Sequence, residues 1–270
     1  MTRSEQIQAL NETLLAEMPA YRSQAASFPK DQTAQRRLLR SLMNVRPPMP
    51  LNREFLVMQD ALLSAERDSK GVVDGAALPA AGGHPRIAIW KGDITRLKVD
   101  AIVNAANAAL LGCFHPCHGC IDNAIHSAAG LQLREECNQI MQAQGCPEPN
   151  GRAKLTKGYN LPARYVLHTV GPIVRGPVTR RDRAELASCY RSCLELAAAQ
   201  GLESVAFCCI STGEFHFPNQ EAAGIAVRTV TEFLRRESSM KRVIFNVFKD
   251  TDETVYRRLL GAGGTAERGA

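Results

Sequence analysis

Two different spacings of apolar side chains divide the chain near residue 80. Before that point, apolar residues recur at intervals of three and four, which places them on one face of a helix. The residues that follow this spacing are Ile7, Leu10, Leu14 and Leu15, and, in a segment that begins near Asp31, Leu38, Leu39, Leu42 and Met43. Another helical run, over residues 55–67, begins after the prolines of VRPPMPLNREF have ended the preceding helix. The pattern predicts a helical N-terminal extension over residues 1–80.

From Arg86 the pattern changes to apolar strands that alternate with helices. The predicted strands are IAIWKGDI, VDAIVNAAN, residues 153–155, YVLHTVGP, SVAFCCIS and RVIFNVF. The predicted helices cover residues 125–144, 184–200, 219–235 and 251–260. Apolar strands separated by helices of ten or more residues are typical of a mostly parallel sheet with helices on both faces. We therefore expect a three-layer α/β/α domain over residues 86–265, connected to the extension by the segment GAALPAAGGHP.

Composition and charge exclude several classes of protein. The chain is 45% hydrophobic and 22% charged, which is ordinary for a soluble globular protein. It has no run of about 18 apolar residues and no apolar signal core at its start, so we expect a cytoplasmic protein with no membrane segment. The net charge of +6 is spread along the chain, whereas specific nucleic-acid binding needs a concentrated basic face. No pattern indicates oligomerisation, so we expect a monomer.

Polar clusters follow four of the predicted strands. These clusters are Gly92-Asp93-Ile94, residues 104–107, residues 168–172 and residues 211–215. In parallel α/β sheets, ligands bind outside the carboxyl ends of the strands. We therefore expect the four loops to converge on one site.

The segment LGCFHPCHGCIDNAIH, residues 111–126, concentrates thiols and imidazoles. Its closely spaced members are Cys113, His115, Cys117, His118 and Cys120. Thiolates and imidazoles are the ligands that zinc prefers. Pro116 and two glycines interrupt any helix here, so we expect a loop that leads into a helix starting near Asp122. Nine cysteines, an odd number in a chain without an export signal, favour reduced thiols over a disulfide framework.

Five motifs, in this order and at these separations, resemble those of the macrodomain family, whose fold binds ADP-ribose. They are WKGDIT, VDAIVNAAN, IDNAIHSAAG, YVLHTVGP and ISTGEFHFP. Most macrodomains have a plain glycine-rich loop where this chain has GCFHPCHGCIDN, and that departure, together with the helical extension, resembles the zinc-dependent subfamily. The resemblance implies a mixed, mostly parallel sheet and a protein-ADP-ribose hydrolase. In some bacteria such enzymes are encoded beside a sirtuin-type ADP-ribosyltransferase and a lipoyl carrier protein.

The resemblance also implies one zinc ion per chain, bound by Cys113, His118 and Cys120. Three protein ligands leave a fourth position for water or substrate, as in catalytic zinc sites. Spacing alone leaves His115 and Cys117 open as alternative ligands. The remaining cysteines and histidines that we expect to be structural are His126, His168, Cys208 and Cys209.

The ADP-ribose contacts follow from the same resemblance. Asp93 matches the acid that binds the adenine amino group, with Ile94 beside the ring, although such an aspartate can also cap the next turn. Asn107 matches the asparagine that reaches the distal ribose, although an asparagine in a turn often bonds the local backbone instead. The phosphate loop comprises Ser211, Thr212, Gly213, Glu214 and Phe215. Successive backbone N–H groups before a helix can surround a pyrophosphate, and the Phe215 ring would pack against the ribose.

Three residues carry the expected chemistry. We expect Asn107 to position the ribose and Asp122, with Ile121 beside it, to contact the pyrophosphate or a water. We expect Glu214 to act as a general base or to support the metal ligands from outside. The expected substrate is a mono-ADP-ribosylated protein, with a lipoyl carrier protein as one candidate. The alternatives are a non-catalytic ADP-ribose-binding module, an O-acetyl-ADP-ribose deacetylase and a zinc-stabilised nucleic-acid binder.

Overall fold

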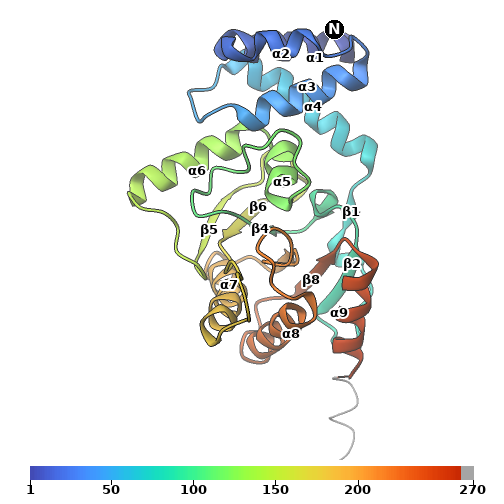
Figure 1. Cartoon of the computed structure of the whole chain (residues 1–270). Helices are drawn as coiled ribbons and strands as arrows, with labels where there is room; N and C mark the ends of the chain where they lie inside the picture. The colour runs from blue at the N-terminus through green and yellow to red at the C-terminus, as the bar shows by residue number, and fades with distance from the viewer. Residues whose placement is uncertain (263–270) are drawn as a thin grey trace, which may run out of the picture.

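The computed structural model describes residues 1–262, and its centre is a six-stranded sheet (Figure 1). The strand order is β2 (Ile87–Lys91), β8 (Arg242–Val247), β7 (Ser204–Phe207), β4 (Ala101–Ala105), β6 (Tyr165–Thr169) and β5 (Ala153–Lys157). Neighbouring strands are parallel except at the edge, where β5 runs antiparallel to β6. A short parallel pair, β1 (Val73–Asp74) and β3 (Leu97–Lys98), lies outside this sheet. Residues 263–265 of the expected domain lie outside the described residues.

Helices cover both faces of the sheet. On one side lie α5 (Ile121–Ala129) and α6 (Leu131–Gln144), and on the other lie α7 (Arg180–Ala199), α8 (Asn219–Arg236) and α9 (Asp250–Ala262) (Figure 1). Between them, the inward side chains of β4, β6, β7 and β8 form a continuous apolar core. The predicted three-layer α/β/α fold with a mixed, mostly parallel sheet is therefore confirmed.

The single helix predicted over residues 125–144 is wrong. Two helices, α5 and α6, meet at Gly130, whose φ of 101° lies in the region that favours glycine. The prediction failed because both helices bury apolar residues toward the same core, so the periodicity continues across the break. The strand predicted from SVAFCCIS is also shorter than expected, since β7 ends at Phe207 before the chain turns.

The N-terminal extension folds around its own apolar core. It contains α1 (Arg3–Glu17), a 3-10 turn η1 (Pro19–Tyr21), α2 (Arg22–Ala26), α3 (Gln32–Val45) and α4 (Arg53–Lys70). Asp31 caps α3 by accepting a hydrogen bond from the backbone N–H of Ala34, which explains why the helix starts there. Leu131 of α6 completes the core of the extension, so the extension packs on the α5 and α6 side of the sheet.

Two further 3-10 turns occur in the chain: η2 (Gly75–Ala77) between β1 and β2, and η3 (Ile94–Arg96) between β2 and β3. Of the helices within residues 1–262, none combines the length and apolar character needed to cross a membrane.

Candidate functional site

A cavity of about 780 Å³ opens where several strands end. Three of the four predicted strand-end clusters line it: Gly92-Asp93-Ile94 after β2, Asn107 with its neighbours after β4, and residues 211–215 after β7. The fourth cluster, residues 168–172, is not among the lining residues. Its His168 is instead buried, paired with Asn104 across β4 and β6. The carboxyl-edge rule thus places most of the polar loops around one cavity.

Cys113, His118 and Cys120 form a group that could hold a metal ion. Their ligand atoms all lie within 4.8 Å of one another, and Cys113 Sγ is 3.7 Å from His118 Nδ1. The three side chains line the cavity and are half-buried. Burial raises the pKa of the Cys120 thiol to about 12, so a thiolate there needs a nearby cation. Two thiols and one imidazole form a donor set that suits zinc.

The two alternative ligands, Cys117 and His115, are not part of this group. The Cys117 sulfur lies 3.3 Å from Ser41 Oγ and 3.6 Å from the Arg37 carbonyl oxygen, both in α3. His115 is exposed, and its ring meets the His118 ring edge-on at 5.4 Å. Neither residue joins the group of three ligand atoms, so tertiary structure separates donors that spacing alone could not.

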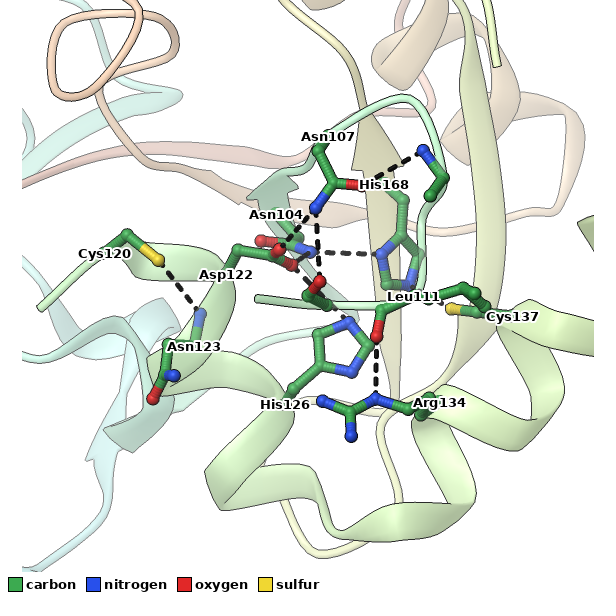
Figure 2. Close-up of polar contacts among 12 residues, drawn as sticks. Asn104, Asn107, Leu111, Cys120, Asp122, Asn123, His126, Arg134, Cys137 and His168 are labelled. Atoms are coloured by element: carbon green, nitrogen blue, oxygen red, sulfur yellow. Dashed lines mark hydrogen bonds and ion pairs between the residues drawn. The ribbon is translucent and has the colours of Figure 1, made fainter. Parts of the chain in front are cut away.

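Asp122 lies in the first turn of α5 and lines the cavity. Figure 2 shows its carboxylate facing the side chains of Asn104 and Asn107. Its carboxylate accepts hydrogen bonds from Asn104 Nδ2 at 2.7 Å and from Asn107 Nδ2 at 3.5 Å. Burial raises the pKa of Asp122 to about 6, although the Asn104 bond and the Arg134 guanidinium act in the opposite direction. The carboxyl group is therefore held in place by amides and shielded from bulk water. Ile121, the preceding residue, also lines the cavity.

Asn107 and Asp93 each make local bonds and also line the cavity. Asn107 Oδ1 accepts from the Ala109 backbone N–H at 3.0 Å, which leaves its Nδ2 pointing toward Gly112 O and Asp122 (Figure 2). Asp93 Oδ1 accepts from both the backbone N–H and the hydroxyl of Thr95, so it caps η3. Each residue thus makes the local hydrogen bond that the sequence offered as an alternative to ligand binding. That bond fixes its side chain at the cavity wall.

The phosphate loop has an unusual backbone at its first residue. Ser211 has a φ of 64°, and its hydroxyl is buried without a hydrogen-bond partner among the described residues. Gly171 faces that hydroxyl so closely that a Cβ there would collide with it. The loop leads into the N-terminus of α8, while Phe215 packs beside Ala106 and Val170. The unpaired hydroxyl and the helix start together favour an anionic ligand.

Glu214 extends from this loop toward the group formed by Cys113, His118 and Cys120. Its side chain is 69% exposed, and Oε1 lies 3.7 Å from His118 Nε2. Because it makes no closer polar contact to a described residue, the carboxylate can accept a proton or reach a bound water.

The sequence interpretation missed part of the cavity wall. Phe248 is 78% exposed and lines the cavity with Asn246, Lys249 and Asp252. These residues follow or end the strand RVIFNVF, so the strand-end rule could have identified them. Cys208 and Cys209, expected only in the core, also line the cavity.

His126 and His168 have the structural character expected of them. Both are fully enclosed, and burial lowers the pKa of His168 to about 3 and that of His126 well below its usual value, so both are neutral. His168 bonds Asn104 through Nδ1 and Thr156 through Nε2. Together with Cys137 they form the other close group of potential ligands within residues 1–262.

Comparison with known proteins identifies the fold. A family model described as Macro domain matches residues 103–226. A protein-ADP-ribose hydrolase of Treponema medium is 52% identical over 262 residues, which cover 96% of this chain and 100% of the relative. One of Staphylococcus aureus (strain MRSA252) is 52% identical over 221 residues, 82% of each chain. A Fusarium oxysporum f. sp. cubense protein, named probable bifunctional ADP-ribose hydrolase/ADP-ribosyltransferase, is 46% identical over 84% of this chain and 41% of its own length.

Solved structures agree with the sequence relatives. The Trypanosoma brucei macrodomain in complex with ADP superposes with a TM-score of 0.65 at 32% identity, covering 83% of this chain and 96% of that chain. The Oceanobacillus iheyensis macrodomain with ADP gives a TM-score of 0.59 at 37% identity, covering 65% of this chain and 90% of that chain. With relatives that are half identical over nearly its whole length, this chain belongs to the macrodomain family.

Proposed function

We propose that this protein removes mono-ADP-ribose from modified protein side chains, using a zinc ion bound by Cys113, His118 and Cys120. The observation that carries the proposal is that the metal-type group and the loops expected to bind ADP-ribose line one cavity. Its volume, about 780 Å³, lies within the range of roughly 300–1,000 Å³ usual for small-molecule sites. The names of the Treponema and Staphylococcus relatives support the same activity.

The donor set fits zinc. Two cysteines and one histidine supply three ligands and leave a fourth position for water or substrate, as catalytic zinc sites do. Because burial raises the pKa of the Cys120 thiol, zinc binding there would release a proton from that thiol. A zinc ion held by these three residues would supply positive charge that stabilises negative charge developing near the ribose.

The protein's own residues would hold the ligand along the cavity. Asp93 and Ile94 would contact the adenine, and residues 211–215 the pyrophosphate, with the unpaired Ser211 hydroxyl as a ready donor. Asn107, whose Oδ1 is already fixed by the Ala109 N–H, would present Nδ2 to the distal ribose. These contacts would place C1 of that ribose beside the metal group.

The carboxyl groups of Glu214 and Asp122 would have different roles. Glu214, exposed and 3.7 Å from His118, would accept the proton of the water that replaces the protein side chain at C1. Asp122, fixed by Asn104 and Asn107, would orient the pyrophosphate or a water rather than exchange protons with solvent. As the water oxygen bonds to C1, the bond from C1 to the modified side chain would break, with its electron pair staying on the side-chain atom. That atom would take up the proton that Glu214 accepted, so that one water is consumed and free ADP-ribose and the unmodified side chain are released.

The modified protein is proposed from resemblance. A lipoyl carrier protein modified by a sirtuin-type ADP-ribosyltransferase is one candidate substrate. The bifunctional name of the Fusarium relative, which joins a hydrolase to a transferase, is consistent with a hydrolase that acts on a transferase product.

Release of ADP-ribose from a mono-ADP-ribosylated protein tests the proposal. Activity should be lost after chelation, return with zinc, and be abolished by Cys120→Ser but retained by Cys117→Ser, because Cys117 points to α3. Turnover that survives chelation would exclude the zinc mechanism. Binding of free ADP-ribose without turnover would indicate a binding module, and turnover of O-acetyl-ADP-ribose alone would indicate a deacetylase.

A further inference from the structure

The metal-binding loop, residues 111–120, rests against α3 of the N-terminal extension. α3 uses its apolar side chains, which include Leu38, Leu39 and Leu42, to build the core of the extension. A neighbouring polar stripe of the same helix faces the loop instead. The residues of this stripe are Arg40, Ser41 and Asn44. These three side chains lie outside the apolar core of the extension and join α3 to the loop and to α5.

Arg40 reaches the loop through its guanidinium. It donates to Asn123 Oδ1 at 2.8 Å from Nη2 and at 3.3 Å from Nε, and Nη2 also lies 3.4 Å from the His118 carbonyl oxygen. Asn123 is fully buried and connects Arg40 to His115, since its Nδ2 donates to the His115 carbonyl oxygen at 2.9 Å. One arginine thus restrains the backbone at both ends of the turn that carries His118.

Asn44 lies one helical turn after Arg40 and restrains the middle of the same turn. Its Oδ1 accepts from the Cys117 backbone N–H at 2.9 Å, and its Nδ2 donates to Ser127 Oγ at 3.0 Å. Cys117 has a φ of 52°, a conformation that costs energy for any residue other than glycine. The bond from Asn44 therefore stabilises a strained residue directly before His118.

The same network reaches the last ligand. The Asn123 backbone N–H donates to Cys120 Sγ at 3.4 Å, and Cys120 caps α5. A side chain in α3 thus touches, through one buried asparagine, both the turn of His118 and the helix start of Cys120.

We infer that Arg40 and Asn44 are positioning residues for the metal site, so that the N-terminal extension is part of the metal-binding apparatus. The inference rests on the proposed function only in taking Cys113, His118 and Cys120 as the metal ligands. Without these bonds the turn can relax from the strained backbone at Cys117, and the imidazole of His118 leaves the two sulfurs. Outer partners of metal ligands typically contribute about 10- to 100-fold in metal affinity.

Cobalt binding to the full chain tests the inference, because Co²⁺ bound to thiolates absorbs visible light and reports both affinity and geometry. We expect Arg40→Gln and Asn44→Leu each to weaken Co²⁺ affinity by about 10- to 100-fold and to alter the absorption bands. Arg40→Lys should restore part of the affinity, since it keeps the charge but cannot fork between Asn123 and the His118 carbonyl. Free ADP-ribose affinity should stay near the wild-type value in all three.

Arg36→Gln is the matched control. Arg36 lies on α3 as well, but it pairs with Glu66 inside the extension and does not touch the loop. It should lower the unfolding midpoint without changing Co²⁺ affinity, which separates a loss of stability from a loss of positioning. If Arg40→Gln fails to fold, Asn44→Leu decides the question.

The outcomes separate the two proposals. Wild-type protein that binds no Co²⁺, or binds it equally well after Cys113→Ser, would overturn the metal site itself. Wild-type binding that depends on Cys113 but is unchanged in Arg40→Gln and Asn44→Leu would overturn only the positioning role. Affinity that falls equally in Arg36→Gln would also overturn it, because the extension would then act through stability alone.

Discussion

Replacing Arg134 by methionine should remove a buried polar connection between the two parts of the chain. The side chain is 3% exposed, and its guanidinium donates to the carbonyl oxygens of Leu111 at 2.7 Å, Met43 at 2.8 Å and Arg46 at 2.6 Å. These carbonyls belong to the loop that carries Cys113, His118 and Cys120 and to the end of α3. Arg134→Met keeps most of the volume of the side chain but leaves the three oxygens buried without a donor.

The expected cost can be worked from these contacts. Bonds with a charged partner contribute about 1.5–3 kcal/mol each, so three of them would sum to roughly 4–9 kcal/mol. Part of this is offset because the variant no longer buries a cation, and breaking a buried charged cluster on one side typically costs about 3–5 kcal/mol. We expect the free energy of unfolding to fall by about that amount, a large share of the roughly 5–15 kcal/mol of a typical domain.

Urea unfolding followed by circular dichroism measures the change from the midpoint and the slope. Arg164→Met is the control, since the Arg164 side chain is 64% exposed and pairs with Asp100 at 3.0 Å. The control should lose no more than about 1 kcal/mol, as exposed ion pairs do. A loss for Arg134→Met no larger than that of the control would refute the reasoning, because the three carbonyl bonds would then add nothing to stability.

Three further outcomes are expected. Phe248→Ala should weaken ADP-ribose binding about 10-fold in calorimetry, as loss of a stacking ring does. Because Phe248 is so exposed, the unfolding midpoint of the protein should not fall. Gly130→Ala should cost about 1–3 kcal/mol in urea unfolding because φ is 101°; an unchanged midpoint would exclude strain at the helix junction. Burial acts to raise the pKa of Glu66, but Arg36 and Arg3 hold it below the usual 4.5, so its ionised form stabilises the fold above that pH. The difference in unfolding midpoint between wild type and Glu66→Gln should therefore shrink as pH falls below about 4.5, and a difference independent of pH would contradict this.

Much of the fold follows from local pattern. The strands of the sheet lack polar interruptions because both of their faces are covered, and the first helices show a single apolar stripe because only one of their faces is buried. Where two successive helices pack against the same core, the spacing of apolar residues does not show where one helix ends and the next begins. The break at Gly130 was missed for that reason.

Position after a strand was informative for the site as well. This position correctly predicted that Asp93, Asn107 and the loop at Ser211 line one cavity. The same rule, applied to the last strand, would have included Phe248. Motif resemblance then supplied roles that no spacing rule contains, and those roles remain predictions.

Only the tertiary structure shows which thiol and imidazole side chains of the loop lie together. The sequence by itself determined that this loop carries five thiol or imidazole side chains and cannot be helical. It did not determine that Cys117 turns toward Ser41 while Cys113, His118 and Cys120 face one another. The directions of side chains in a loop depend on what packs behind it, and here that is α3, more than 70 residues earlier in the chain. Spacing along a loop limits which atoms can meet, whereas contacts with a distant helix, such as the bonds from Arg40 and Asn44, depend on the tertiary structure.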